Sequence, residues 1–201
     1  MRPLRIVMVA AITVASLAPV PTTAQPALVI KPLAERKVAD LPAGSLYWRI
    51  ENFSTPDAAQ AVAGPWALVA QAEGKTWLFT LGPAGGASPG GTKVAEVGPI
   101  ARVSASSYLL RINEASGPPG SATSVHMHPG SEAFYVLAGE QSIRQPQGVL
   151  RVRPGQAEPG RGADIAMQVS SSGSADLHAL VMFVVDATKP FSSPATLPAA
   201  P

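Results

Sequence analysis

Apolar and polar residues alternate along most of this chain in short runs, which glycine, proline and serine separate. The runs are rich in aromatic and β-branched residues and have the two-residue period of a half-buried β-strand. The pattern predicts an extended segment over residues 93–103 and strands over 46–52, 66–72, 75–81, 108–115, 124–128, 132–137, 140–144, 149–152, 165–170 and 177–185. We therefore expect an all-β fold.

One stretch has helix signals instead. Thr55 offers a capping hydroxyl, Pro56 suits the first helical turn, and Asp57 lies near the positive end of the helix dipole. Residues 58–63 continue as good helix formers, so we predict a short helix of about two turns. The two strands that follow it are expected to form a hairpin, with its turn at residues 73–74.

The last predicted strand, residues 177–185, is apolar on both faces. One face is expected to meet the core, and the other needs cover from the N-terminal part of the chain or from a second copy. Residues 25–43 are rich in proline and mixed in charge, which indicates an extended arm. Residues 188–201, rich in proline, serine and alanine, are expected to form a flexible tail.

The first residues have the features of a secretory signal. Arg2 and Arg5 precede an apolar run over residues 6–20 that is too short to span a bilayer comfortably, and small residues precede Gln25. We expect a signal peptide over residues 1–24 and a secreted or periplasmic location. No later stretch is apolar and long enough for a membrane span.

Composition narrows the range of chemistry. The 201 residues include no cysteine, which excludes disulfide frameworks, thiolate metal sites and cysteine nucleophiles. Removal of residues 1–24, which carry two arginines and no acid, leaves 13 basic and 13 acidic residues. This balance, without a basic cluster among aromatics, argues against a nucleic-acid partner.

Residues 86–90 match the Gly-x-Ser-x-Gly pattern of a hydrolase nucleophile elbow around Ser88. The residue after that serine should donate its backbone N–H to the oxyanion, but here it is Pro89, which has none. The following Gly90 and Gly91 also disfavour the helix that the elbow requires. We therefore interpret residues 82–91 as a flexible surface loop.

The strongest chemical signal is a pair of histidines near a glutamate. His126 and His128 are two residues apart, so on a strand both imidazoles point to one face. A Pro-Gly turn follows, and a return strand would bring Glu132 beside them. Two imidazoles and a carboxylate form a facial ligand set with open coordination positions. A hydrogen-bonded surface pair is the alternative, but two of the three histidines in the chain lie in this turn.

The same residues resemble the first motif of the cupin family. Gly120, His126, His128, Glu132 and Gly139 stand at the spacing of that motif, and every defining position is filled. The resemblance implies a cupin double-stranded β-helix (jelly-roll) barrel, and residues 25–100 fall outside it. Together with the signals described above, the expected domains are the signal peptide (1–24), an N-terminal extension of arm, short helix and hairpin packed on the barrel (25–100), the barrel (101–187) and the tail (188–201).

The second cupin motif departs from the family. Residues 159–171 place Met167 where the resemblance leads us to expect a third histidine, and Ser171 where an asparagine is expected. Met167 could ligate a soft metal such as copper through its thioether, or pack beside a three-ligand site, or mark a degenerate site. His178 is a possible substitute ligand, although its apolar neighbours favour a hydrogen-bonded core or interface role.

These expectations converge on an exported cupin that binds one divalent transition metal (Fe, Mn, Zn, Ni or Cu) through His126, His128 and Glu132, with Met167 as a further candidate ligand. Its partner would be a small organic molecule, converted by a dioxygenase or isomerase reaction. The alternative is a non-catalytic metal- or ligand-binding module. Cupins commonly pair as homodimers, and the apolar last strand would suit such a pair.

Overall fold

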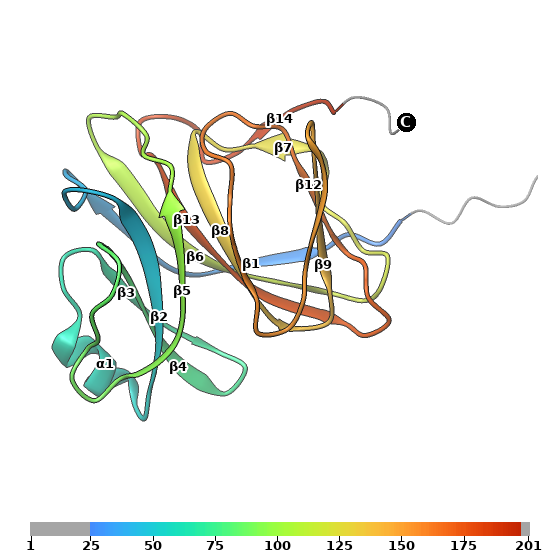
Figure 1. The fold of residues 1–201 in the computed structure, drawn as a ribbon. Coiled ribbons are helices and arrows are strands. Elements are labelled where there is room, and N and C mark those ends of the chain that lie inside the picture. Colours follow the sequence, from blue (N-terminus) through green and yellow to red (C-terminus); the bar gives the residue numbers. More distant parts are fainter. Residues whose placement is uncertain (1–24, 198–201) are drawn as a thin grey trace, which may run out of the picture.

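Antiparallel strands dominate the structure, a computed structural model that describes residues 25–197 (Figure 1). The predicted signal peptide and residues 198–201 lie outside the described part. Each predicted strand is present, with its ends shifted by a few residues, and the described chain contains one helix. The all-β prediction is therefore confirmed.

A five-stranded antiparallel sheet forms one wall of a barrel, and β13 runs between β6 and β8 at its centre. The order of its strands is β1 (Val29–Val38), β6 (Tyr108–Gly117), β13 (Leu177–Asp186), β8 (Gly130–Ala138) and β11 (Ala157–Pro159).

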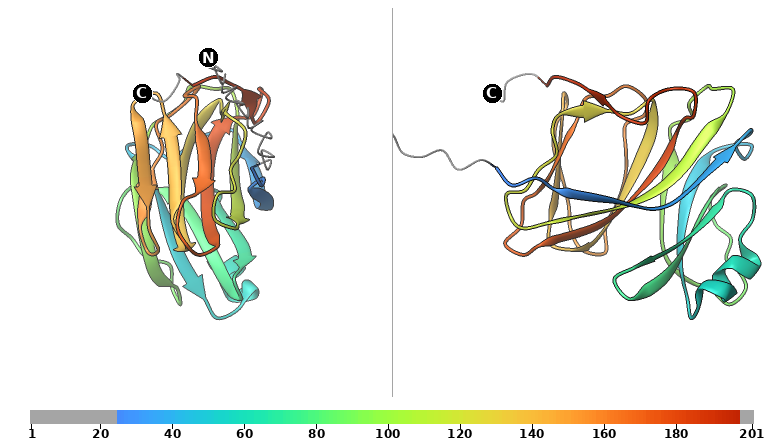
Figure 2. Two further views of the ribbon diagram at one scale, coloured as in Figure 1. Left: turned by 90° about the vertical axis from the view of Figure 1, so that its right-hand side faces the viewer. Right: turned by 180° about the vertical axis from the view of Figure 1, so that it is seen from behind.

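Two smaller sheets form the opposite wall of the barrel (Figures 1 and 2). Phe134 and Val181 of the large sheet share a buried cluster with Ile143 and Val169 of the opposite wall, so the two walls enclose one core. This arrangement is the expected double-stranded β-helix. The strands of the opposite wall are β10 (Gly148–Val152), β9 (Gln141–Gln145) and β12 (Gln168–Ser171), then β7 (His126–Met127) paired with β14 (Ser193–Pro194).

The N-terminal extension is a four-stranded sheet with the helix at its side (Figure 1). Thr55 Oγ1 accepts a hydrogen bond from the Ala58 amide at 3.2 Å, so the predicted cap is present. The predicted hairpin is also confirmed, with Ala72 opposite Lys75. The elements are β2 (Leu46–Phe53), α1 (Pro56–Val62), β3 (Ala67–Ala72), β4 (Lys75–Gly82) and β5 (Thr92–Ile100).

The apolar strand β13 has both faces buried within its own chain. Val181 and Phe183 face the barrel interior, whereas Leu180 and Met182 pack in a second core that includes Trp77 of the N-terminal sheet. The cover that the sequence required therefore comes from the N-terminal part. Because that face is occupied, it offers no surface for a second copy, and the apolar strand β13 does not support a homodimer.

Three segments without a strand prediction are paired in the structure: β11, which pairs with β8, and two that lie near the ends of the described residues. The expected arm contains β1, which pairs with β6 along its whole length and so joins the N-terminal residues to the barrel sheet. The expected tail contains β14, which pairs with β7, and the Ala195 amide donates to the Val125 carbonyl at 3.2 Å. This part of residues 188–201 is packed rather than loose, because the strand edges of β6 and β7 offered backbone partners.

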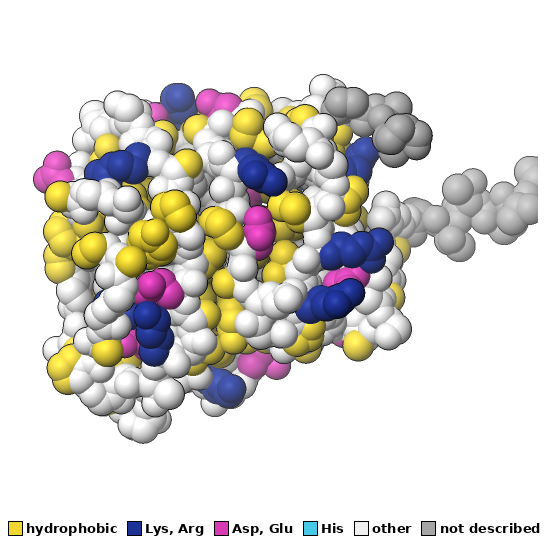
Figure 3. Space-filling model, in the orientation of Figure 1, with side chains coloured by type: hydrophobic (Ala, Val, Ile, Leu, Met, Phe, Trp, Pro, Cys, Tyr) yellow, Lys and Arg dark blue, Asp and Glu magenta, His cyan; other side chains and the backbone are white. Residues whose placement is uncertain are grey.

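The surface is mixed in charge. Figure 3 shows basic and acidic side chains interspersed on one face of the molecule, and no histidine side chain is visible there. Within residues 25–197, no helix has the length and apolar character needed to cross a membrane.

Candidate functional site

The turn between β7 and β8 brings the three predicted ligands to one cavity. His126 lies on β7, His128 follows it, and Glu132 lies on β8. Gly130 opens β8 directly against β13, where a Cβ atom would lie 2.2 Å from the Val184 carbonyl oxygen. Only glycine permits this approach, which explains why the turn carries it.

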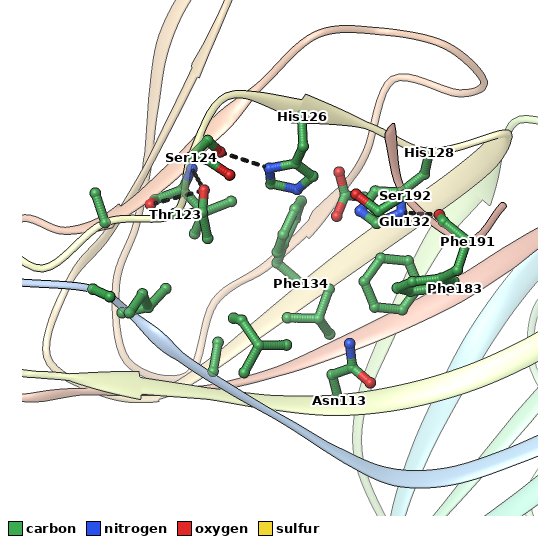
Figure 4. Close-up of a pocket in the computed structure, with 17 residues that line it drawn as sticks. Asn113, Thr123, Ser124, His126, His128, Glu132, Phe134, Phe183, Phe191 and Ser192 are labelled. Carbon is green, nitrogen blue, oxygen red and sulfur yellow. Dashed lines mark hydrogen bonds between the residues drawn. The ribbon is translucent and has the colours of Figure 1, made fainter. Parts of the chain in front are cut away.

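Backbone carbonyl groups fix both imidazole rings (Figure 4). His126 Nδ1 lies 2.9 Å from the Ser124 oxygen, and His128 Nδ1 lies 2.6 Å from the Phe191 oxygen. Since a carbonyl oxygen can only accept, each Nδ1 carries the hydrogen and each Nε2 keeps its lone pair. The two ring centroids are 5.0 Å apart and the planes are nearly perpendicular. Both rings are therefore held in the tautomer that can ligate a metal through Nε2.

Burial favours the neutral forms of Glu132 and His128 by shifting their pKa values. Burial raises the pKa of Glu132, which is 3% exposed, to about 8. Burial also lowers the pKa of His128 to about 4, with smaller contributions in the same direction from the charges of His126 and Arg111, while the Phe191 carbonyl opposes them. Both shifts follow from the poor solvation of charge inside the barrel.

Glu132 also has an orphaned oxygen. Its Oε1 is buried and has no hydrogen-bond partner among the described residues. A divalent cation would neutralise this carboxylate and satisfy the free oxygen together with the two Nε2 atoms. The donor chemistry of His126, His128 and Glu132 therefore fits a metal ion.

The cavity behind these residues has a volume of about 360 Å³ and is mainly apolar. Phe134, Phe183 and Phe191 line it (Figure 4), and no lysine or arginine of the described residues does. Its polar lining residues other than the three predicted ligands are Asn113, Thr123, Ser124 and Ser192. A concave apolar site with a few converging polar groups is typical of small-molecule binding.

Three other residues have potential metal-donor atoms that lie closer together than those of the cavity site. Within residues 25–197, the only three histidine or acidic side chains whose donor atoms lie within 4.8 Å of one another are Glu73, Glu114 and His178. The three donors of the cavity site are farther apart than this, so a shared ion requires them to approach. The trio lies outside the barrel, because Glu114 points away from its neighbours Asn113 and Ala115, which line the cavity.

His178 therefore belongs to this outer group and does not complete the cavity site. Its Nδ1 lies 2.9 Å from Glu73 Oε1, an ion-pair distance, although the contact does not meet hydrogen-bond geometry. Glu73 comes from the β3–β4 turn, so the N-terminal sheet supplied a partner that the sequence around His178 does not indicate.

Met167 lies next to His126 but does not line the cavity. The two residues exchange backbone hydrogen bonds of 2.9 and 2.8 Å, which places their side chains on one face. The Met167 side chain is 2% exposed and packs with Ile143 and Val169 in the barrel core. These contacts favour packing, and thioether ligation stays a prediction.

The C-terminal segment contributes residues that the sequence did not indicate. Phe191 lies against His128 and Phe183, with ring centroids 4.7 and 4.9 Å away, and the Arg111 guanidinium lies 4.2 Å above its ring. Phe191 is the one aromatic residue after position 186, which is the only available signal. Asn113 was also missed, because it stands between Ile112 and Glu114 and nothing in that local pattern distinguishes it.

No family model and no curated protein matches the sequence. Solved structures do match its fold. A cupin-like protein from Thermotoga maritima is 12% identical over 44% of this chain and 65% of that one, with a TM-score of 0.39. A double-stranded β-helix protein from Klebsiella pneumoniae is 20% identical over 43% and 75%, with a TM-score of 0.37. A polyketide cyclase from Streptomyces resistomycificus is 22% identical over 45% and 63%, with a TM-score of 0.36. The chain thus spans just under two thirds of the first and the last of these proteins.

Proposed function

We propose that the protein is an exported, metal-binding cupin that acts on a small organic molecule. The observation that carries this proposal is the convergence of two oriented imidazoles and the orphaned Glu132 carboxyl on one apolar cavity. Export is supported by the character of residues 1–24 in the sequence.

In this proposal one divalent metal is held by His126, His128 and Glu132. Nitrogen and oxygen donors suit Fe, Mn, Zn, Ni or Cu, and the thioether of Met167 would add a preference for copper if it ligated. When bound, such a metal supplies Lewis acidity or a site for dioxygen. The carbonyl groups of Ser124 and Phe191 hold the imidazoles in position, and Phe183 and Phe191 exclude water from the cavity.

Turnover by a dioxygenase or isomerase reaction is one form of the proposal, and ligand binding without turnover is the other. The residues that line the cavity support ligand binding without turnover. Apart from the three proposed ligands, no histidine, lysine, arginine or acidic residue among residues 25–197 lines the cavity. No separate general acid or base is therefore available on its wall, and any chemistry would depend on the metal and its ligands.

Metal content of purified protein tests the proposal. The full-length protein, dialysed against each metal in turn, is expected to retain one ion per chain, and the His126→Ala, His128→Ala double variant is expected to retain none. The matched control removes the outer trio with Glu73→Gln and His178→Ala and should keep the ion. Equal and negligible metal in wild type and double variant contradicts the proposal, and loss of the ion only in the control moves the metal to the outer trio.

Catalysis and export have separate tests. Oxygen uptake and isomerisation are measured with small phenols, diketones and sugars on metal-loaded protein, with the double variant as the blank. Turnover confined to the wild type supports an enzyme, and binding without turnover supports the module. For export, the protein isolated from its host should begin at Gln25, and an intact residue 1 would argue against cleavage.

A further inference from the structure

A single amide side chain lies on the cavity wall across from the two imidazoles. Asn113 belongs to β6 of the five-stranded sheet, where it pairs with Val181 of β13. His126 belongs to β7 of the opposite wall. Figure 4 shows Asn113 and the two histidines on opposite sides of the cavity. The amide is therefore placed to meet the end of a ligand that is remote from the histidines.

This amide is buried without partners. Asn113 is 2% exposed, its Oδ1 has no hydrogen-bond partner among the described residues, and no hydrogen bond of its Nδ2 to them is observed. In Figure 4 the amide nitrogen points into the cavity. A buried polar group that makes no hydrogen bond is costly, and such groups are uncommon in folded proteins. Since Nδ2 faces the cavity and no hydrogen bond from it to the described residues is observed, it is free to donate one to a ligand atom.

The rest of the wall sets the character of that ligand. Phe134, Phe183 and Val181, the cross-strand neighbour of Asn113, line the same cavity, so the body of the ligand must be largely apolar. No lysine or arginine in the described part of the chain lines the cavity. Arg111 lies two residues before Asn113 on the same strand, but its guanidinium lies over the ring of Phe191 and donates a hydrogen bond to Glu35.

An anionic group at the Asn113 end would therefore be buried without a countercharge. Burial of an unpaired charge is far more costly than burial of a neutral oxygen that is hydrogen-bonded. Phosphate and carboxylate groups are disfavoured at this end for that reason. A carbonyl, ether or hydroxyl oxygen satisfies the amide at no such cost.

We propose that Asn113 is a specificity-determining residue, which hydrogen-bonds the neutral oxygen of a small, uncharged and largely apolar ligand at the end remote from His126 and His128. The assignment of the other end of the ligand to a metal rests on the proposed function. The role of Asn113 does not, because the cavity and its unpaired amide exist without an ion.

Three benzene derivatives test this inference on full-length protein, both in EDTA and after loading with zinc. Acetophenone carries a carbonyl oxygen, isopropylbenzene has nearly the same shape without it, and benzoate carries a charge. Dissociation constants come from NMR titration. Wild type should prefer acetophenone over isopropylbenzene, with benzoate weakest in EDTA. Asn113→Leu should weaken the binding of acetophenone about five- to tenfold, the usual effect of one lost hydrogen bond. Its affinity for isopropylbenzene should be unchanged or higher.

Two further variants keep the result interpretable. Ala115→Val narrows the same wall without a change in polarity, so it should affect acetophenone and isopropylbenzene alike. Asn113→Val also removes the amide and has a side chain that suits a strand, so it serves if the leucine variant fails to fold. The melting temperature of Asn113→Leu should not fall, because an apolar side chain replaces an unsatisfied polar one.

An unchanged preference in the Asn113 variants overturns the inference. So does a benzoate affinity in EDTA that equals or exceeds that of acetophenone, or the absence of binding by all three probes. If the Asn113 effect is seen in EDTA but no metal loads, this inference stands and the proposed metal site fails.

Discussion

His128 donates its Nδ1 hydrogen to the carbonyl oxygen of Phe191, 2.6 Å away, although the two residues lie 63 positions apart in the sequence. The segment that follows the last barrel strand therefore orients one of the candidate ligands. The same residue places its ring against His128 and Phe183 at the cavity wall. Residues after position 186 are thus part of the site.

Removal of residues 191–201 should weaken metal binding. Loss of the Phe191 carbonyl frees the His128 ring to rotate, and loss of such supporting partners typically costs about 10- to 100-fold in metal affinity. Phe191→Leu is the matched control, since it keeps the carbonyl and should stay near wild type. The measurement is zinc affinity by competition with a chelating dye. Equal affinities for the truncated and wild-type proteins would show that the hydrogen bond does not position the ligand.

Glu132→Gln should remove a pH dependence of stability in metal-free protein. The pKa of Glu132 is raised to about 8 in the fold, against 4.5 for an ordinary glutamate, so the native state holds a proton that the unfolded chain releases. Stability is therefore lost as pH rises from about 4.5 to about 8, by up to roughly 5 kcal/mol. Glutamine stays neutral at every pH and avoids this loss.

The melting temperatures of the two proteins in EDTA should accordingly be similar at pH 5 and diverge at pH 8, with the glutamine variant higher by more than about 5 °C. His128 acts in the opposite sense in both proteins, because burial lowers its pKa to about 4 and stability is lost as pH falls from 6.5. A constant difference between the variants across this pH range would show that Glu132 titrates normally.

Met167→Leu should leave metal affinity unchanged. The side chain is 2% exposed, packs with Ile143 and Val169, and does not line the cavity, so a leucine of similar volume should replace it at a cost below about 1.5 kcal/mol. Copper and zinc affinities of variant and wild type provide the measurement. A selective loss of copper binding would show that the thioether is a ligand after all.

Glu51→Ala should destabilise the N-terminal sheet. Glu51 is fully buried and accepts hydrogen bonds from the Ser88 amide and hydroxyl at 2.7 Å each and from Arg49 at 3.0 Å. Burial alone would raise its pKa, but the bonds from Ser88 and Arg49 outweigh burial and lower it. Removal of the carboxylate leaves these donors unpaired, and the expected loss is about 3 kcal/mol in urea unfolding.

Glu51→Gln is the matched variant for that loss. It keeps an acceptor for Ser88 but removes the charge, so its loss should be smaller. Because the folded pKa of Glu51 is lowered, the stability that it contributes should fade as pH falls below 4.5 through the folded value.

The contacts with Glu51 make Ser88 a donor to a carboxylate, so a fluorophosphonate probe should not label it. Labelling at Ser88 would restore the hydrolase interpretation.

The sequence by itself determined the strands and the turn that carries the site. Strand periodicity is local, and so are the cap at Thr55 and the Pro-Gly turn before β8; each can be inferred from neighbours in the chain. The spacing of His126, His128 and Glu132 likewise places them on adjacent strand ends. These features depend on backbone geometry over a few residues.

Only the tertiary structure decided what each of these groups meets. The partner of His178 is Glu73 from a hairpin 105 positions earlier, the carbonyl that orients His128 belongs to an expected tail, and the amide across the cavity comes from β6. β1 and β14 are strands because free edges of β6 and β7 bond to them. Hydrogen bonds and burial between distant segments depend on how the sheets close into a barrel, and no local pattern in the sequence encodes that closure.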